Sequence, residues 1–267
     1  MLYRHYPSIY HVGHPQIADL FTDEVLIEEK IDGSQFSFWM ESPAGTPRFH
    51  SRSSEIYPCN SDKIFKPAIE KVLEIKDKLK PGLFYRGETL YRPKHNTLAY
   101  ERTPNGNIML FDIDDGNGNF WGWEEKKWKA EELGLEVVPL VFRGMMDVTL
   151  LTEWVTKELS EISILGGCKR EGLVFKNYKR FGKDDKPLMG KYVSEAFKEK
   201  HGVDWKNRNP GANDIILNLT NIYRHENRWT KAIQHLSEQG LITDDPKDIG
   251  KLMFEIQNDV KKEEYEN

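Results

Sequence analysis

The stretch EEKIDGSQF, residues 28–36, places a lysine between two glutamates and an Asp-Gly pair, inside a segment with the pattern of β-structure. The segments 25–31 (VLIEEKI) and 35–41 (QFSFWME) predict two strands, and the second alternates well between apolar and polar residues. Asp-Gly between two strands is a common hairpin signal, so a turn is expected there. Lys30 is then either a solvated side chain beside a turn or a residue that carries out chemistry.

The rest of the chain divides into a mixed part and a helical part. Further strands are expected at 83–91, 107–114, 136–144, 171–178 and 188–193, and helices at 62–79 and 149–160. After about residue 194 the apolar period is helical, and helices are expected at 194–201, 213–225, 229–239 and 246–264. The sequence therefore predicts an α+β domain over residues 1–205 and a small helical domain over 206–267.

Composition sets limits on the class of protein. The chain has 267 residues, a net charge of −5 and 38% hydrophobic residues, which is typical of a soluble globular protein. No apolar run approaches the roughly 18 residues of a membrane helix, and the N-terminus has no signal-peptide pattern. With only Cys59 and Cys168, a disulfide framework or thiolate zinc site is not expected, and a reducing cytoplasm fits. Nothing in the sequence indicates an obligate oligomer, so we expect a monomer.

Charge is unevenly distributed along the chain. Residues 169–208 carry twelve Lys or Arg against six Asp or Glu, whereas residues 241–267 carry four against eight. A basic stretch of this kind either binds phosphate locally or is a solvated face.

Several short motifs follow Lys30 in order. They are Ser51-Arg52-Ser53, Arg86-Gly87-Glu88, Phe111-Asp112-Ile113, Glu171-Gly172-Leu173-Val174 and Lys191. This ordered set, over about residues 28–193, resembles the covalent nucleotidyltransferase superfamily of ATP-dependent DNA ligases, RNA ligases and mRNA capping enzymes. Within it the chain is most similar to RNA ligases of the T4 RNA ligase 2 type and related phage-encoded ligases. DNA ligases and capping enzymes continue with an OB-fold of roughly 100 β-rich residues, whereas the remaining residues here look helical.

The resemblance implies both a fold and an activity. The fold is an ATP-grasp-like nucleotidyltransferase domain of antiparallel sheets with flanking helices, followed by the helical domain. The activity is ATP-dependent joining of RNA 5′-phosphate and 3′-hydroxyl ends through a lysyl–AMP on Lys30 and an adenylated 5′ end. Such an enzyme would serve RNA repair in the cytoplasm of a bacterium or a phage-infected cell. The alternatives are a DNA ligase lacking an OB domain and an RNA-end-binding module that has lost catalysis.

The resemblance also implies roles for the residues around the nucleophile. Glu28 or Glu29 would hold the adenine edge, and Asp32 and Gly33 would support Lys30 through a tight turn. The remaining roles are phosphate or RNA-end binding by Arg52, ribose or metal binding by Glu88, stacking on adenine by Phe111, Mg²⁺ binding by Glu171 (with Mn²⁺ as a substitute), and neutralisation of the α-phosphate by Lys191 and Lys176. Family members often carry two lysines separated by one residue, whereas this chain has Lys191 and, further upstream, Lys186.

The chemistry requires a neutral amine at Lys30. The ordinary lysine pKa of about 10.4 makes that form rare at neutral pH. Burial and neighbouring cations, including Mg²⁺ and other lysines, are expected to lower it.

Two other segments have open interpretations. Residues 91–97 suit a nucleic-acid end, a triphosphate or a plain loop, and Trp121, Trp123 and Trp128 are expected to pack structurally.

Overall fold

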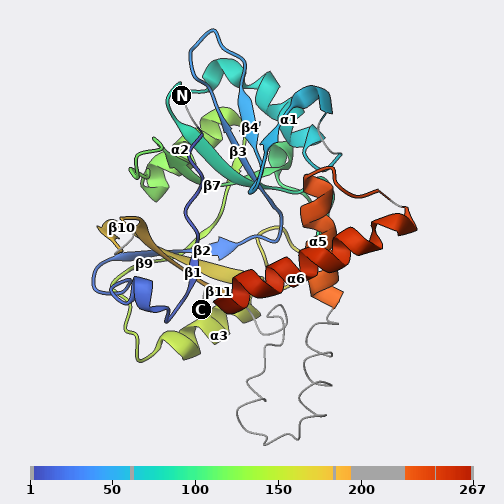
Figure 1. Ribbon diagram of the computed structural model, residues 1–267. Coiled ribbons are helices and arrows are strands. Elements are labelled where there is room, and N and C mark those ends of the chain that lie inside the picture. Colours follow the sequence, from blue (N-terminus) through green and yellow to red (C-terminus); the bar gives the residue numbers. More distant parts are fainter. Residues whose placement is uncertain (1–2, 61–62, 183–184, 194–225, 244, 266–267) are drawn as a thin grey trace, which may run out of the picture. The chain divides into compact units, whose positions relative to one another are not determined.

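The computed structural model describes residues 3–60, 63–182, 185–193, 226–243 and 245–265 (Figure 1). Contacts divide the chain into two units, residues 1–193 and 194–267, which are treated separately below. The predicted boundary at 205/206 and the helices predicted at 194–201 and 213–225 lie outside the described residues.

The first sheet, sheet A, contains the strand that ends at Lys30. Its five strands have the order β1-β11-β10-β2-β9 and are antiparallel except for the parallel pair β1–β11. Their bounds are Tyr10–His11 (β1), Pro187–Val193 (β11), Gly172–Phe181 (β10), Val25–Lys30 (β2) and Leu140–Gly144 (β9). Helix α3 (Leu151–Ser160) packs beside this sheet (Figure 1), where Val155 joins a core with Ile27 and Phe175.

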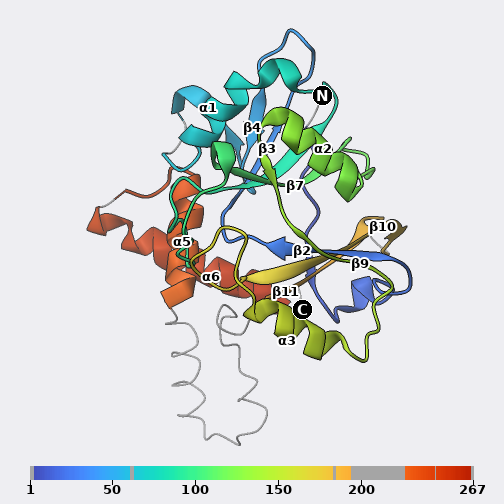
Figure 2. The ribbon, with the colours of Figure 1, turned by 180° about the vertical axis from the view of Figure 1, so that it is seen from behind.

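The second sheet, sheet B, holds the larger apolar core. Its six strands have the order β5-β4-β3-β6-β7-β8, and only the pair β7–β8 is parallel. Their bounds are Glu55–Ile56 (β5), Arg48–His50 (β4), Ser34–Trp39 (β3), Phe84–Thr89 (β6), Ile108–Asp114 (β7) and Glu136–Val137 (β8). Helices α1 (Lys66–Glu74) and α2 (Trp123–Leu133) lie beside sheet B in both ribbon views (Figure 2). Short 3₁₀ turns occupy Pro15–Ile17, Pro58–Asn60, Lys76–Lys78, Asn105–Asn107 and, in the second unit, Pro246–Asp248.

The hairpin predicted around Asp32-Gly33 is wrong, although its two strands form almost where expected. β2 pairs with β10 and β9, whereas β3 pairs with β4 and β6, so the chain crosses from one sheet to the other at residues 31–33. Each strand is bonded on both edges and mostly buried, which leaves no edge for pairing between them. Gly33 is needed for a close approach, because a Cβ there would lie 2.8 Å from the Thr89 carbonyl oxygen.

Two other elements differ from expectation for reasons visible in the sequence. The predicted strand 136–144 divides into β8 in sheet B and β9 in sheet A, and the break includes Pro139, which has no N–H for a ladder. The predicted helix 62–79 shortens to α1, with Pro67 in its first turn, and a separate 3₁₀ turn follows.

The second unit contains a pair of helices, α5 (Glu226–Glu238) and α6 (Ile249–Tyr265), close to the predicted 229–239 and 246–264. Leu236 and Ile256 are buried, His235 bonds Glu255, and Lys231 bonds an oxygen of Asp259 at 2.9 Å. Within the described residues, no helix is both long enough and apolar enough to cross a membrane.

Candidate active site

Lys30 is held by a carboxylate at the end of its strand. Its Nζ lies 2.8 and 2.9 Å from the two carboxylate oxygens of Glu171, and 28% of the lysine side chain is exposed. The register explains this meeting, because Lys30 lies opposite Gly172 and Glu171 is the residue before it. A Cβ at position 172 would lie 2.5 Å from the Tyr192 carbonyl oxygen, so glycine permits the close packing of β10 against β11.

The charge around Lys30 is opposite to the expected one. Burial alone would lower the pKa of Lys30, but the carboxylates of Glu171, Glu88 and Asp32 together raise it above its usual value. Burial raises the pKa of Glu171, and the nearby ammonium of Lys30 opposes that rise. Without a ligand, therefore, the protein favours the ammonium form of Lys30, and the expected lowering of its pKa needs added cations.

Strand register brings two predicted lysines to the face of sheet A that carries Lys30. Val174 lies opposite both Glu28 and Lys191, and side chains two residues apart on a strand share a face. Lys191 therefore shares the face of Glu28 and Lys30, as does Lys176, two residues beyond Val174 on β10. The positive charge of Lys191 also opposes the rise in the pKa of Glu171, which agrees with their nearness.

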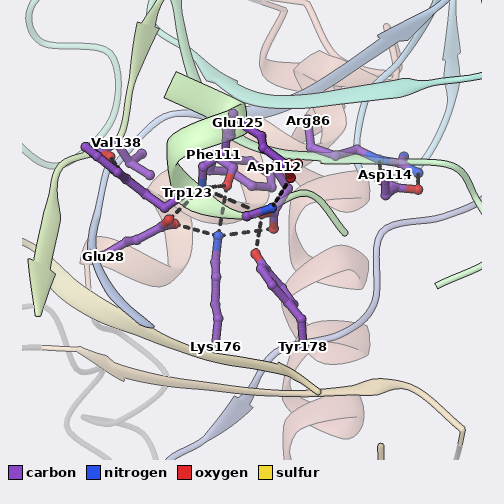
Figure 3. Close-up of polar contacts among 12 residues, drawn as sticks. Glu28, Arg86, Phe111, Asp112, Asp114, Trp123, Glu125, Val138, Lys176 and Tyr178 are labelled. Atoms are coloured by element: carbon purple, nitrogen blue, oxygen red, sulfur yellow. Dashed lines mark hydrogen bonds and ion pairs between the residues drawn. The ribbon is translucent and has the colours of Figure 1, made fainter. Parts of the chain in front are cut away.

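Glu28 belongs to a buried cluster of four charged side chains (Figure 3). Its carboxylate oxygens accept from Lys126 at 2.5 Å and from Lys176 at 2.6 Å, and both lysines also donate to the main-chain oxygen of Phe111. Lys176 makes a further bond of 3.1 Å to Asp112. The cluster joins β2 and β10 of sheet A to β7 and α2, and its two cations balance its two carboxylates.

Three members of this region, Lys126, Tyr6 and Tyr178, were not predicted from the sequence. Both tyrosine hydroxyls donate to Asp112, and Lys126 reaches the cluster from α2. In the run EEKKWK nothing distinguishes the buried Lys126 from the exposed Lys127, because the helix has little apolar periodicity. Burial lowers the pKa of Lys126, and the nearby Glu28 opposes this.

Glu29 points to the opposite face of β2 and holds a loop. It accepts from the Ser163 hydroxyl at 2.5 Å and from the Ile164 backbone N–H at 3.1 Å. Burial raises its pKa, although these two bonds and Arg170 oppose the rise. The protein therefore occupies the oxygens of both Glu28 and Glu29, the pair expected at the adenine edge.

Asp32 holds a second loop. Its carboxylate accepts from the backbone N–H groups of Thr97 and Leu98 at 2.9 and 2.8 Å, and from the side chain of Asn96 at 3.2 Å. Its own N–H donates to the Tyr100 hydroxyl at 2.8 Å. Glu28, Glu29, Lys30 and Asp32 of the motif thus each bind a different part of the fold.

The other residues predicted for the site, Glu88, Phe111 and Arg52, differ in their relation to Lys30. Glu88 on β6 is half-buried and near enough to raise the pKa of Lys30. The ring of Phe111 is half-buried, 5.1 Å edge-on from Tyr6, with Lys176 Nζ 5.7 Å from its centroid. Arg52 is exposed in the loop between β4 and β5, and no contact within the described part of the chain joins it to Lys30.

The three tryptophans expected to pack behave differently from one another. Trp121 packs against the core of sheet B, and Trp123 donates to the Val138 carbonyl at 3.3 Å. The expectation is wrong for Trp128, which is 63% exposed at a surface hollow shared with Glu124 and Glu125.

A divalent cation fits the charge around Lys30. Within the described residues no group of three or more His, Cys, Asp or Glu side chains forms a metal site of its own. Mg²⁺, however, keeps several waters and needs only one or two carboxylates. Glu171 and Glu88 supply oxygen ligands of the required kind, and their negative charges raise the pKa of Lys30.

Comparisons with known proteins give one family. A family model described as RNA ligase matches residues 23–193. No curated protein matches the chain in sequence. Among solved structures, an RNA ligase from Naegleria gruberi with PPi has a TM-score of 0.54 and 20% identity, covering 78% of this chain and 61% of that one. A mutant of that ligase with ATP and Mn has a TM-score of 0.53 and 20% identity, covering 77% of this chain and 60% of that one. A mutant with AMP and Mn has a TM-score of 0.53 and 21% identity, covering 76% of this chain and 58% of that one.

These structural matches establish the fold. The predicted α+β architecture of two mainly antiparallel sheets with flanking helices is confirmed. The chain covers about three-fifths of the length of the solved structures it resembles.

Proposed function

The chain belongs to the RNA ligase family, and from this premise we propose that it is an ATP-dependent RNA ligase with Lys30 as its nucleophile. It would join the 5′-phosphate and 3′-hydroxyl ends of RNA through a lysyl–AMP. The T4 RNA ligase 2 type, a role in RNA repair and a phage or bacterial source remain predictions from the sequence, as do the monomeric state and the cytoplasmic location.

One observation carries the proposal. Lys30 is a partly exposed amine at a strand end, and it contacts both oxygens of a largely buried carboxylate whose residue begins a second motif of the family. A merely solvated lysine would not be matched by converging carboxylates from three separate segments, Glu171, Glu88 and Asp32. Perturbed ionisable groups of this kind are typical of catalytic sites.

The first step follows from the properties of the amine. Lys30 must lose its ammonium proton before its lone pair attacks the α-phosphorus of ATP. The P–N bond then forms as the bond to the pyrophosphate oxygen breaks, and the nitrogen loses a second proton. Such transfers depend on alignment and charge neutralisation rather than on a special reactive group.

Two further transfers complete the proposed reaction. An oxygen of the RNA 5′-phosphate attacks the phosphorus of lysyl–AMP, which breaks the P–N bond and returns the amine of Lys30. The 3′-hydroxyl then attacks the 5′-phosphate, forms the phosphodiester bond and releases AMP.

The metal-binding and phosphate-binding roles are assigned by position. Glu171 and Glu88 would hold a divalent cation, Mg²⁺ or Mn²⁺, which supplies positive charge that favours the neutral amine and neutralises phosphate oxygens. Lys191, on the face that carries Lys30, would bind the α-phosphate. Lys176 is fully buried in ion pairs, so a positioning role for it is better supported than direct phosphate contact.

The nucleobase-binding roles remain proposals. Phe111 would stack on adenine with its half-buried ring. Because protein donors already hold Glu28 and Glu29, we assign them a positioning role, with Glu28 fixing β2 against β10 and α2 and Glu29 fixing the 161–170 loop. Arg52 would bind an incoming phosphate from its exposed loop.

The test is covalent labelling. The protein is incubated with α-labelled ATP and Mg²⁺ and then separated on a denaturing gel. A label that survives denaturation in the wild type and is absent from folded Lys30→Ala supports the proposal. Absence of a covalent label in the wild type from neutral to alkaline pH contradicts it. Incubation with labelled GTP tests a capping-type activity, and sealing of matched RNA and DNA ends separates an RNA ligase from a DNA ligase.

A further inference from the structure

Two surface loops are attached directly to the lysine motif. We call residues 91–101 and 161–170 together the basic rim. Asp32 fixes the first loop through Thr97, Leu98 and Asn96, and Glu29 fixes the second through Ser163 and Ile164. The two residues that hold the rim, Glu29 and Asp32, therefore directly flank the dipeptide Lys30-Ile31 in the chain.

The first loop has internal support that sets its shape. The His95 ring contacts the Ser34 hydroxyl at 2.9 Å and accepts from the Tyr91 N–H at 3.2 Å. Burial lowers the pKa of His95 to about 4, so the ring is neutral at physiological pH. Asn96 also donates to the Gly33 carbonyl at 2.9 Å. These bonds hold the loop against the start of β3.

The two loops also bind each other. The N–H of Glu101 bonds the Leu165 carbonyl at 3.2 Å, and Arg102 N–H bonds the same carbonyl at 3.3 Å. A Cβ at Gly167 would lie 2.8 Å from the Glu101 nitrogen, which shows how closely the backbones approach. The rim is therefore a continuous surface rather than two separate tips.

The exposed charged side chains of the rim are three cations and two carboxylates. Arg92, Lys94 and Lys169 are exposed, and the Arg92 guanidinium lies 4.9 Å from the centroid of the Tyr91 ring. Counting Lys, Arg, Asp and Glu, the two loops carry four cations, Arg92, Lys94, Lys169 and Arg170, against the two carboxylates Glu101 and Glu161. The chain as a whole carries a net charge of −5, so the rim differs in sign from the average of the chain.

We propose that the basic rim is the binding surface for the sugar–phosphate backbone of the RNA strand whose end reacts at Lys30, with Arg92, Lys94 and Lys169 contacting its phosphates. This inference rests on the proposed function, and it adds the surface that receives the RNA. The RNA 5′-phosphate that receives AMP must approach the lysyl–AMP phosphorus, so the strand must pass the residues that border Lys30. Single strands are bound by positive grooves with aromatic or guanidinium planes for stacking, which the Tyr91–Arg92 pair provides.

The experiment compares two triple variants of equal charge. The rim variant is Arg92→Gln/Lys94→Gln/Lys169→Gln. The control is Lys66→Gln/Lys127→Gln/Lys157→Gln, which removes three exposed cations from α1, α2 and α3. Anisotropy measures the binding of a 5′-phosphorylated single-stranded RNA across a salt series, which does not depend on catalysis. A second assay gives the ratio of the rate of AMP transfer to RNA to the rate of lysyl–AMP formation.

Loss of three phosphate contacts makes the negative slope of log K against log salt shallower by about 2, since each contact contributes roughly −0.7 on single strands. We expect binding at least tenfold weaker than in the control triple at about 0.1 M salt, and a lower transfer ratio. Equal binding by the two triples overturns the inference. A wild type that binds RNA through the rim but forms no lysyl–AMP would contradict the proposed function and leave the rim supported.

Discussion

Lys30 Nζ bonds both carboxylate oxygens of Glu171, at 2.8 and 2.9 Å. The ion pair stabilises the ammonium form, which cannot act as a nucleophile. A divalent cation on Glu171 would compete with the ammonium for the same oxygens and remove the interaction that keeps Lys30 protonated. In the proposed function, metal binding at Glu171 would therefore favour the neutral amine of Lys30.

The ion pair predicts a shift in the titration of Lys30. In Glu171→Gln the anionic partner is lost, so the ammonium is less stable and the pKa of Lys30 falls. The midpoint for its reaction with an acylating reagent should therefore move to lower pH in metal-free buffer. Mass spectrometry of the peptide that carries Lys30 measures the midpoint. Glu74→Gln, which removes the exposed partner of Lys71 on α1, is the control and should leave it unchanged.

A second prediction concerns the buried charges around Glu28. Lys126→Met removes one of the two cations that face the carboxylates of Glu28 and Asp112 in this cluster, so the free energy of unfolding should fall by about 3–5 kcal/mol. The neighbouring Lys127→Met, at an exposed position, should change it by less than about 0.5 kcal/mol. Urea unfolding followed by circular dichroism measures both.

A double variant separates charge imbalance from lost packing. Adding Glu28→Gln to Lys126→Met restores the charge balance of the cluster, so the pair should cost less than the sum of the two single changes. Additive costs, or a Lys126→Met cost no larger than that of Lys127→Met, would show that this cluster does not depend on its ion pairs.

The sequence was sufficient for the parts of the site that follow from strand alternation. Lys30, Lys191 and Glu171 lie in strands or beside them, and the order of motifs indicated that they meet. The sequence was not sufficient where a short connection can either form a hairpin within one sheet or cross to another sheet. The three residues between β2 and β3 have the composition of a hairpin, and only the pairing of both strands with distant segments shows that they cross between sheets.

Long-range polar contacts were also beyond prediction. Lys126 is buried because Glu28, 98 residues earlier in the chain, lies opposite it, and no local pattern encodes that meeting. The loop at 91–97 could be described by composition, but its attachment to Asp32 depends on backbone N–H groups, which every residue except proline carries.

The contacts of Asp32 predict the stability of that loop. Asp32→Ala removes the acceptor of the Thr97 and Leu98 N–H groups, and charge-assisted bonds of this type contribute about 1.5–3 kcal/mol each. Amide hydrogen exchange at residues 96–98 should therefore accelerate at least about tenfold. In the control, Asp115→Ala, the turn at 115–119 should loosen instead, because Asp115 accepts from Asn117 and Asn119. Unchanged exchange at 96–98 in Asp32→Ala would mean that other contacts hold the loop.

The last prediction distinguishes the two lysines near the end of the ligase region. Lys191 shares the face of Lys30. Lys186 is exposed just before β11, and an extended chain of five residues places it about 16 Å from Lys191. Of these two lysines, Lys191 is therefore the one expected to neutralise a phosphate that reacts at Lys30. Lys191→Ala should slow lysyl–AMP formation roughly 10²- to 10³-fold at saturating ATP, as expected when a charge that stabilises the transition state is lost. Lys186→Ala should slow it less than about threefold, since an exposed charge at that distance is screened by salt. Single-turnover labelling with α-labelled ATP measures both rates, and Lys191→Arg, which keeps the charge, should recover part of the loss. Equal rates in the two alanine variants would remove Lys191 from the proposed phosphate site.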